Sequence, residues 1–288
     1  MELRHLRYFR TLAQTLNFTR AAEQLHIAQP PLSRQIQQLE DELGVSLIER
    51  SRPLRLTPAG RFFQEHATEL LERLDRICAD TRRVADGQKR WLGIGFAPST
   101  LYGELPELIR QLRASGEVEL GLSELITLQQ VEALKNGRID IGFGRIRIDD
   151  PAVVQEVIRQ DPLVAALPSM HRLLGQQATL AELATEPFVL YPGYPRPSYA
   201  DHVLGLFAAQ GLPIHVVQVV NEMQTAMGLV AAGLGITLVP ASVQRLHRDD
   251  IGYCTLIDSQ ATSPIIMSYR ATDNSSLLKR CKELVLKL

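Results

Sequence analysis

The chain has 288 residues, of which 45% are hydrophobic and 22% charged, a composition that predicts an ordinary globular protein with two domains rather than one. The net charge of −1 gives no sign of nucleic-acid binding, although residues 1–90 carry 15 basic and 12 acidic side chains and residues 91–288 carry 16 and 20. Three cysteines without metal spacing, a charged N-terminus and the lack of a long apolar run predict a cytoplasmic protein without disulfide, signal peptide or membrane span.

The first 43 residues predict three helices. Residues 3–15 are expected to form a helix that packs its apolar side chains on a helix-turn-helix over residues 18–43. In the first helix of this pair, Thr19 is expected to be the N-cap. The second helix begins at Pro30 and Pro31, because proline lacks a backbone N–H and fits the first turn of a helix. Its inner stripe is expected to be Leu32, Ile36, Leu39 and Leu43.

The outer face of the second helix carries polar side chains of the kind that hydrogen-bond base edges and phosphates, and no acid occurs over residues 29–38. These side chains crowd the start of the helix, which is the end that enters a major groove. A helix pair whose outer face is merely solvated is the alternative interpretation. DNA contacts are expected from Thr19, Gln29, Pro30, Pro31, Ser33, Arg34 and Gln37.

Residues 45–56 are expected to form a small β-wing. Its Arg50 and Arg52 are predicted to contact phosphates or a narrow minor groove, with a solvated loop as the alternative. Thr57 as N-cap then starts a helix that runs to about residue 88. Its apolar stripe is too narrow for a buried core helix, which predicts pairing with a second copy of the chain. The stripe consists of Phe62, Leu70, Leu74, Ile77 and Val84.

From residue 91 onward, short apolar strands alternate with helices, a pattern that predicts parallel α/β sheets. The first group of expected elements has strands at 91–96, 118–122 and 139–143 and helices at 102–113 and 128–136. The second group has strands at 163–167, 188–191, 214–220 and 236–239 and helices at 180–184, 198–210 and 223–232.

A ligand crevice is expected beyond the carboxyl ends of these strands, between two lobes. Ser99, Thr100, Thr127 and Ser198 stand at expected helix starts, where free backbone N–H groups and the helix dipole favour an anion. Each residue taken alone is more often a simple N-cap. Together with Arg145 they predict a pocket for a small carboxylate or dicarboxylate.

Motifs along the whole chain resemble those of LysR-type transcriptional regulators. They are Leu3-Arg-His-Leu-Arg-Tyr-Phe9, Phe18-Thr-Arg-Ala-Ala22, Gln29-Pro-Pro-Leu-Ser-Arg-Gln-Ile36, Leu39-Glu-Asp-Glu-Leu-Gly44 and Leu56-Thr-Pro-Ala-Gly60. The resemblance implies an α/β protein with a winged helix-turn-helix at 1–58, a dimerising linker helix at 59–90 and an effector domain at 91–288. It further implies that the effector domain has the two-subdomain fold of periplasmic binding proteins, with subdomain I at 91–161 and 265–288 and subdomain II at 162–264.

Within this family, several segments resemble regulators of catechol and benzoate catabolism. They are Gly95-Phe-Ala-Pro-Ser99, the run from Glu132 to Arg145, Leu190-Tyr-Pro192, Gly228-Leu-Val-Ala-Ala-Gly233 and Leu238-Val-Pro-Ala-Ser242. The resemblance implies activation in response to cis,cis-muconate, repression of the chain's own gene, and operator DNA and RNA polymerase as partners. It also implies a homodimer formed through the linker helix, within a tetramer.

The same resemblance implies which residues contact the effector. They are Ser99, Thr127, Arg145, Pro197, Ser198 and Tyr199. Arg159 matches the anion partner of a second, benzoate-binding pocket, but Asp161 stands where related chains have a glutamate. No nucleotide-binding, nucleophile or metal-ligand motif is found, so neither catalysis nor a cofactor or metal is expected. A regulator of another aromatic acid or dicarboxylate, or a cytosolic solute-binding protein or enzyme, is the alternative.

Overall fold

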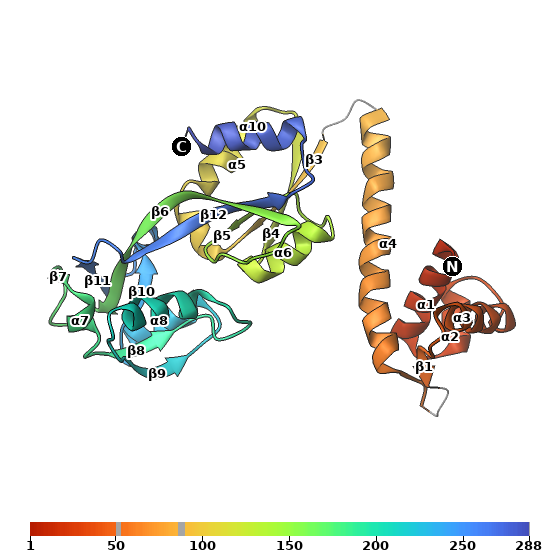
Figure 1. The fold of residues 1–288 in the computed structure, drawn as a ribbon, viewed down its shortest axis with the longest axis horizontal. Coiled ribbons are helices and arrows are strands. Elements are labelled where there is room, and N and C mark those ends of the chain that lie inside the picture. The colour runs from red at the N-terminus through yellow and green to blue at the C-terminus, as the bar shows by residue number, and fades with distance from the viewer. Residues whose placement is uncertain (50–52, 86–89, 288) are drawn as a thin grey trace. The chain divides into compact units, whose positions relative to one another are not determined.

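The computed structural model describes residues 1–49, 53–85 and 90–287, and the chain divides into two compact units, residues 1–88 and 89–288 (Figure 1). The first unit consists of α1 (Leu3–Thr15), α2 (Phe18–Gln24), α3 (Gln29–Leu43), β1 (Ile48–Glu49), β2 (Arg55–Leu56) and α4 (Pro58–Ala85). Strands β1 and β2 pair antiparallel and form the expected wing. The core lies where the first three helices meet and includes Phe9, Leu12, Leu32, Ile36 and Leu39.

Two details of the helix-turn-helix correct the sequence predictions. The N-cap of α2 is Asn17, because its extended backbone lets Oδ1 accept hydrogen bonds from the N–H groups of Thr19 at 2.9 Å and Arg20 at 3.1 Å. Thr19 therefore lies inside the helix and does not cap it. Leu43 is 37% exposed. Gly44 follows it in the left-handed conformation at φ +69° and ends α3, so no further turn covers Leu43.

Helix α4 begins as predicted, since Thr57 Oγ1 accepts a hydrogen bond from the N–H of Gly60 at 2.9 Å. One side of its first half is buried, where Ala67 and Leu71 pack with Leu6 of α1. Part of the stripe predicted to pair with a second copy is exposed, namely Phe62 at 66%, Leu70 at 50% and Ile77 at 53%. The side chain of Val84 lies outside the described part of the chain.

The second unit contains the remaining elements. Its strands are β3 (Arg90–Phe96), β4 (Val118–Glu124), β5 (Ile141–Gly144), β6 (Val153–Pro168), β7 (Gln177–Ala178), β8 (Pro187–Leu190), β9 (His215–Val219), β10 (Thr237–Pro240), β11 (Ile251–Leu256) and β12 (Thr262–Arg270). Its helices are α5 (Leu105–Ala114), α6 (Thr127–Lys135), α7 (Leu180–Leu183), α8 (Tyr199–Ala209), α9 (Met223–Ala231) and α10 (Ser276–Val285), with 3₁₀ helices η1 (Pro98–Tyr102) and η2 (Ala241–Leu246).

Two lobes share the long antiparallel strands β6 and β12 (Figure 1). The first lobe is built from β3, β4, β5, α5, α6 and α10, and its core includes Ile94 and Leu108. The second lobe is built from β7 to β11 and α7 to α9, and its core includes Phe188 and Phe207. The strand order β4-β3-β5-β12-β6-β11-β7 therefore runs from one lobe into the other, and β10 also pairs with β6. The subdomain boundary expected after residue 161 falls inside β6.

Two expectations for this unit were wrong in part. The sheet is mixed: β3 pairs parallel with β4 and β5, whereas β12 pairs antiparallel with β5 and β6. The single helix expected at 102–113 is instead η1 followed by α5. Gly103 ends η1 and Pro106 sits in the first turn of α5, so the chain restarts a helix there. No helix within the described ranges is long and apolar enough to cross a membrane.

Candidate functional site

The residues predicted to contact DNA gather around the N-terminal end of α3. The exposed ones are Thr19 on α2 and Gln29, Pro30, Pro31, Arg34 and Gln37 on α3, and Ser33 is half-buried. Gln37 Nε2 donates a hydrogen bond to Asp41 Oδ1 at 2.9 Å. Arg50 and Arg52 of the wing lie outside the described residues. The arrangement presents a polar helix end of the kind that reads a major groove.

Buried polar contacts fix α3 to its neighbours. His5 Nε2 of α1 lies 2.9 Å from Gln35 Oε1, in hydrogen-bond contact. Glu40 is only 6% exposed, and its Oε1 accepts hydrogen bonds from the N–H groups of Leu47 at 2.7 Å and Ile48 at 3.0 Å. Glu40 therefore ties the wing strand β1 to the end of α3. Glu40 was not predicted from the sequence, although an acid beside the apolar stripe of α3 was a visible signal.

A cavity of about 400 Å³ opens between the two lobes of the second unit. Ser99 of η1, Thr127 of α6 and Arg145 after β5 line it from the first lobe. Pro197, Ser198 and Tyr199 line it from the second lobe, at the start of α8. Six of the seven residues predicted to bind the effector thus face one cavity.

Thr100 is the exception. It is 1% exposed and its Oγ1 donates a hydrogen bond to the carbonyl oxygen of Ala97 at 2.7 Å. In a 3₁₀ helix consecutive residues point about 120° apart, so Thr100 cannot share the direction of Ser99. Thr100 instead lines a second, separate cavity.

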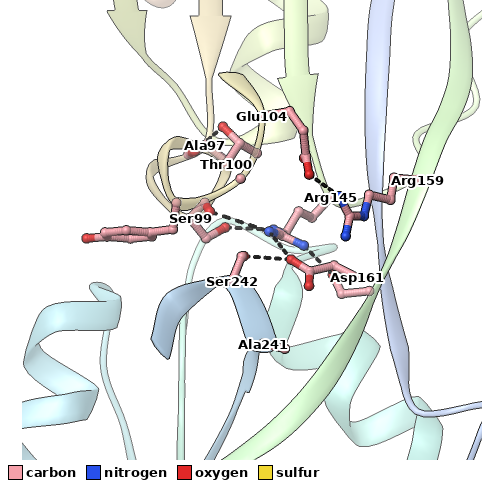
Figure 2. Close-up of polar contacts among 12 residues, drawn as sticks. Ala97, Ser99, Thr100, Glu104, Arg145, Arg159, Asp161, Ala241 and Ser242 are labelled. Atoms are coloured by element: carbon pink, nitrogen blue, oxygen red, sulfur yellow. Dashed lines mark hydrogen bonds and ion pairs between the residues drawn. The ribbon is translucent and has the colours of Figure 1, made fainter. Parts of the chain in front are cut away.

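Arg145 is 4% exposed and holds the first lobe's side of the cavity together (Figure 2). Its Nε donates to Ser99 Oγ at 2.8 Å, and its Nη1 donates to Ser263 Oγ at 3.4 Å. Its Nη2 donates to Asp161 Oδ2 at 3.0 Å and to the carbonyl oxygen of Ser99 at 3.4 Å. Its backbone N–H donates to Thr127 Oγ1 at 3.2 Å. Four of the five guanidinium N–H groups therefore already have acceptors.

Asp161 extends this network to the second lobe. It lies in β6 and is 5% exposed, so its carboxylate neutralises Arg145 in a buried ion pair. Ser242 of η2 also donates its hydroxyl to Asp161 Oδ2, at 2.7 Å (Figure 2). Because Arg145 is paired internally, an incoming anion must find most of its hydrogen-bond donors elsewhere in the cavity.

Those donors are hydroxyl and backbone groups. Ser99 and Thr127 each accept a hydrogen bond from Arg145, which leaves the hydroxyl proton of each side chain able to donate to an anion. The first three backbone N–H groups of α6, from Thr127 to Gln129, have no acceptor within the described residues. They lie at the N-terminus of the helix, which is the positive end of its dipole, and their residues line the cavity. By contrast, the hydroxyl of Ser198 donates to the carbonyl oxygen of Pro192 at 2.9 Å.

The second cavity, of about 170 Å³, lies within reach of Arg159. Its walls are mainly apolar side chains: Leu105, Leu108, Phe143, Ile158, Ile265, Val285 and Leu286. Arg159 is more than half exposed and forms an ion pair with Glu104 (Figure 2). Arg159, the one cation among the described residues that line this cavity, therefore already has a carboxylate partner.

Several residues that line the cavity between the lobes were not predicted from the sequence. They are Glu124, Tyr191, Tyr194, Asn221 and Glu222 among others. Tyr191 directly follows β8, so the rule that ligands bind at the carboxyl ends of strands would have found it. Glu222 immediately precedes α9 and gave no distinct signal. Asp161 was recognised only as an unusual residue near Arg159, and its pairing with Arg145 depends on the folded path of β6.

Two family models match the chain. The one described as LysR substrate binding domain matches residues 85–288, and the one described as bacterial regulatory helix-turn-helix protein, lysR family, matches residues 3–61. The HTH-type transcriptional regulator CatR of Pseudomonas putida is 66% identical over 285 residues, which cover 99% of this chain and 98% of that protein. The regulator BenM of Acinetobacter baylyi is 44% identical over 283 residues, with 96% and 93% covered.

Solved structures with similar folds include regulators bound to DNA and to a ligand. Full-length CbnR complexed with its target DNA superposes with a TM-score of 0.83 at 34% identity, covering 100% of this chain and 99% of that one. The effector-binding domain of BenM with its effector benzoate superposes with a TM-score of 0.64 at 38% identity, covering 68% of this chain and 90% of that one.

Proposed function

This chain belongs to the LysR family of transcriptional regulators, which are not enzymes, and we propose that it activates catechol and benzoate catabolic genes when cis,cis-muconate binds between its lobes. The observation that carries the proposal is the cavity of about 400 Å³ in which Ser99, Thr127 and the start of α6 offer converging donors. The 66% identity to CatR along the whole chain supports the same pathway.

The chemistry of the cavity favours a carboxylate. The donors at the first lobe are hydroxyl and backbone N–H groups organised by Arg145, and such groups can solvate a carboxylate without moving when it arrives. The second lobe adds the backbone N–H of Tyr199 at the start of α8 and the rings of Tyr191 and Tyr199, whereas the N–H of Ser198 donates to Asp201 Oδ2 at 2.8 Å. An elongated planar acid with a carboxylate at each end fits polar walls on both lobes, whereas benzoate carries only one carboxylate.

Effector binding is proposed to act through the lobes. Strands β6 and β12 run through both lobes, so an acid that contacts Ser99 on one side and the start of α8 on the other would favour a closed arrangement over an open one. In an oligomer on DNA such a shift would change the spacing of the DNA-binding units and allow contact with RNA polymerase.

The first unit is proposed to bind operator DNA in the cytoplasm. Its residues Thr19, Gln29, Pro30, Pro31, Ser33, Arg34 and Gln37 would contact the operator, together with Arg50 and Arg52 of the wing. Two copies joined through the exposed stripe of α4 would place two α3 helices on a two-fold related site. We propose a tetramer built from such dimers, which also represses the chain's own gene.

Calorimetric titration of the full-length protein with cis,cis-muconate and with benzoate tests the effector. Saturable muconate binding, with a matching shift in a promoter mobility assay, is the expected result. Binding of another acid but not of muconate would agree with a ligand-responsive regulator and would reject muconate as its effector.

A salt-titrated mobility shift on the chain's own promoter region tests DNA binding, because genuine phosphate contacts weaken steeply with salt. Absence of any shift at low salt would reject the proposal for DNA.

Arg159 and the second cavity support a second proposal, namely that benzoate binds there. The apolar walls suit an aromatic ring, and Arg159 would be the partner of the carboxylate. Benzoate would have to replace Glu104 at Arg159, so we expect weaker binding there than muconate binding between the lobes. Titration of the Arg159→Ala variant with benzoate tests this site, since unchanged benzoate affinity would reject it.

A further inference from the structure

Tyr191 carries a buried hydroxyl that the fold leaves without a partner. The residue follows β8, lines the cavity between the lobes and is 7% exposed. Its hydroxyl oxygen is buried and has no hydrogen-bond partner among the described residues. Such groups are rare in folded proteins, because burial strips the hydroxyl of water without replacing the lost hydrogen bond. Gln130 and Tyr253 also have an unpartnered buried atom, but neither lines this cavity.

The Tyr191 hydroxyl is available as a donor. Burial raises the pKa of Tyr191, against the opposing effects of the positive charge of Arg145 and of the nearby Tyr199 hydroxyl, so the phenol stays neutral and keeps its proton at physiological pH. The neighbouring Tyr199, whose ring centroid lies 5.3 Å away, directs its hydroxyl toward the carbonyl oxygen of Leu238 at 3.4 Å. The proton of Tyr191 has no such internal acceptor.

The position of Tyr191 complements the donors of the first lobe. Ser99 and Thr127 offer hydroxyl protons from one lobe, and Tyr191 lines the same cavity from the other lobe, where the positive charge of Arg145 acts on its hydroxyl. We propose that the Tyr191 hydroxyl is a specificity-determining donor that binds the second carboxylate of a dicarboxylic effector. This inference rests on the proposed function, since it assigns one end of the same acid to each lobe.

A preference for dicarboxylates follows from this assignment. A monocarboxylic acid would be held by the first lobe and would leave the Tyr191 hydroxyl as unpaired as it is in the free protein. A dicarboxylic acid would give that hydroxyl a charged acceptor, and hydrogen bonds to charged groups are stronger than neutral ones. It would also tie the second lobe to the first, which a monoacid would not do.

The test compares two ligands on three full-length proteins. The ligands are cis,cis-muconate and hexa-2,4-dienoate of the same double-bond geometry, which has one carboxylate and a methyl group instead of the other. The proteins are the wild type, Tyr191→Phe and the matched control Tyr253→Phe, which also loses an unpartnered buried hydroxyl but lies away from the cavity. Calorimetry gives each affinity, and thermal denaturation gives the stability of each free protein.

We expect Tyr191→Phe to weaken muconate binding about tenfold or more, to leave hexa-2,4-dienoate binding unchanged and to leave the free protein at least as stable. Tyr253→Phe should change neither affinity. Equal muconate affinity of Tyr191→Phe and the wild type would overturn the inference and leave the proposed effector intact. A melting temperature of free Tyr191→Phe below that of the wild type would also overturn it, because it would show that the hydroxyl has a stabilising partner in the free protein. If the wild type binds no muconate, the proposed effector fails first and this assignment with it.

Discussion

Arg34 and Arg145 are the two arginines on which the proposed function depends, and their surroundings are opposite. Arg34 is exposed on α3 and makes no hydrogen bond or ion pair within the described residues. Arg145 is 4% exposed and contacts side chains from η1, β6 and β12. An arginine that meets its partner only in the complex can be removed without touching the fold. An arginine that assembles a site cannot, so loss of Arg145 should appear in both stability and binding.

The largest effect is expected from Arg145→Ala. Among the described residues the substitution leaves Ser242 as the remaining polar partner of the buried Asp161 carboxylate, which should cost about 3 kcal/mol of unfolding free energy. It also releases Ser99 and Thr127 from their fixed orientations, so muconate binding should be lost. Denaturant unfolding and calorimetry of the full-length variant measure the two effects.

A double variant separates the two roles of Arg145. In Arg145→Ala with Asp161→Ala neither charge of this buried pair remains, so most of the stability should return while muconate binding stays absent. Arg147→Ala is the matched control, because Arg147 is exposed two residues away. If the single variant Arg145→Ala were as stable as the wild type, the role assigned to the buried ion pair would be wrong.

Arg34→Ala should show the opposite behaviour. Stability and muconate affinity should stay unchanged, because the side chain is exposed and belongs to the other compact unit. If the guanidinium contacts a base, the free energy of operator binding should weaken by about 1–3 kcal/mol. If it contacts a phosphate, binding should weaken and the dependence of the affinity on salt concentration should become less steep. Mobility-shift titrations at several salt concentrations distinguish these cases.

The control for Arg34→Ala is Arg110→Ala, which removes the same charge from an exposed position on α5. Arg110→Ala should bind the operator like the wild type. Equal operator affinity of all three proteins at every salt concentration would remove Arg34 from the DNA-binding face.

The contrast between the two arginines also explains which features the sequence revealed. Most of the predicted DNA-binding residues lie on one helix, α3, and their spacing was visible in the chain, down to the two prolines at the start of that helix. The N-cap was misplaced because Asn17 and Thr19 are both good capping residues, and only the backbone conformation decides between them. Leu43 was misplaced because the position of the terminating Gly44 decides its exposure.

The cavity was harder to predict because its walls come from segments far apart in the chain. Helix starts could be predicted one by one, and Ser99 and Thr127 do face the cavity. Thr100 could not be separated from Ser99 without knowing which side of η1 faces the cavity. The pairing of Arg145 with Asp161 depends on the crossing of β6 beside β12, two long antiparallel strands where a parallel sheet was expected.

A smaller effect separates the two serines of the cavity. The hydroxyl proton of Ser99 is able to reach an anion, so Ser99→Ala should weaken muconate binding about tenfold. The hydroxyl proton of Ser198 is engaged with the carbonyl oxygen of Pro192, so Ser198→Ala should change muconate affinity much less. Calorimetry on both variants tests the difference. A greater loss in Ser198→Ala than in Ser99→Ala would reverse the assigned roles.

The smallest effect is expected at Arg159, which combines features of both arginines, since it is 55% exposed yet already paired with Glu104. Glu104→Gln removes the competing carboxylate, so benzoate affinity in the second cavity should rise a few-fold. Because the ion pair is largely exposed, the unfolding free energy should change by less than about 1 kcal/mol. Benzoate titration of Glu104→Gln and of the double variant with Arg159→Ala measures this. A gain that persists without Arg159 would place benzoate elsewhere, and no gain at all would mean that Glu104 does not compete for Arg159.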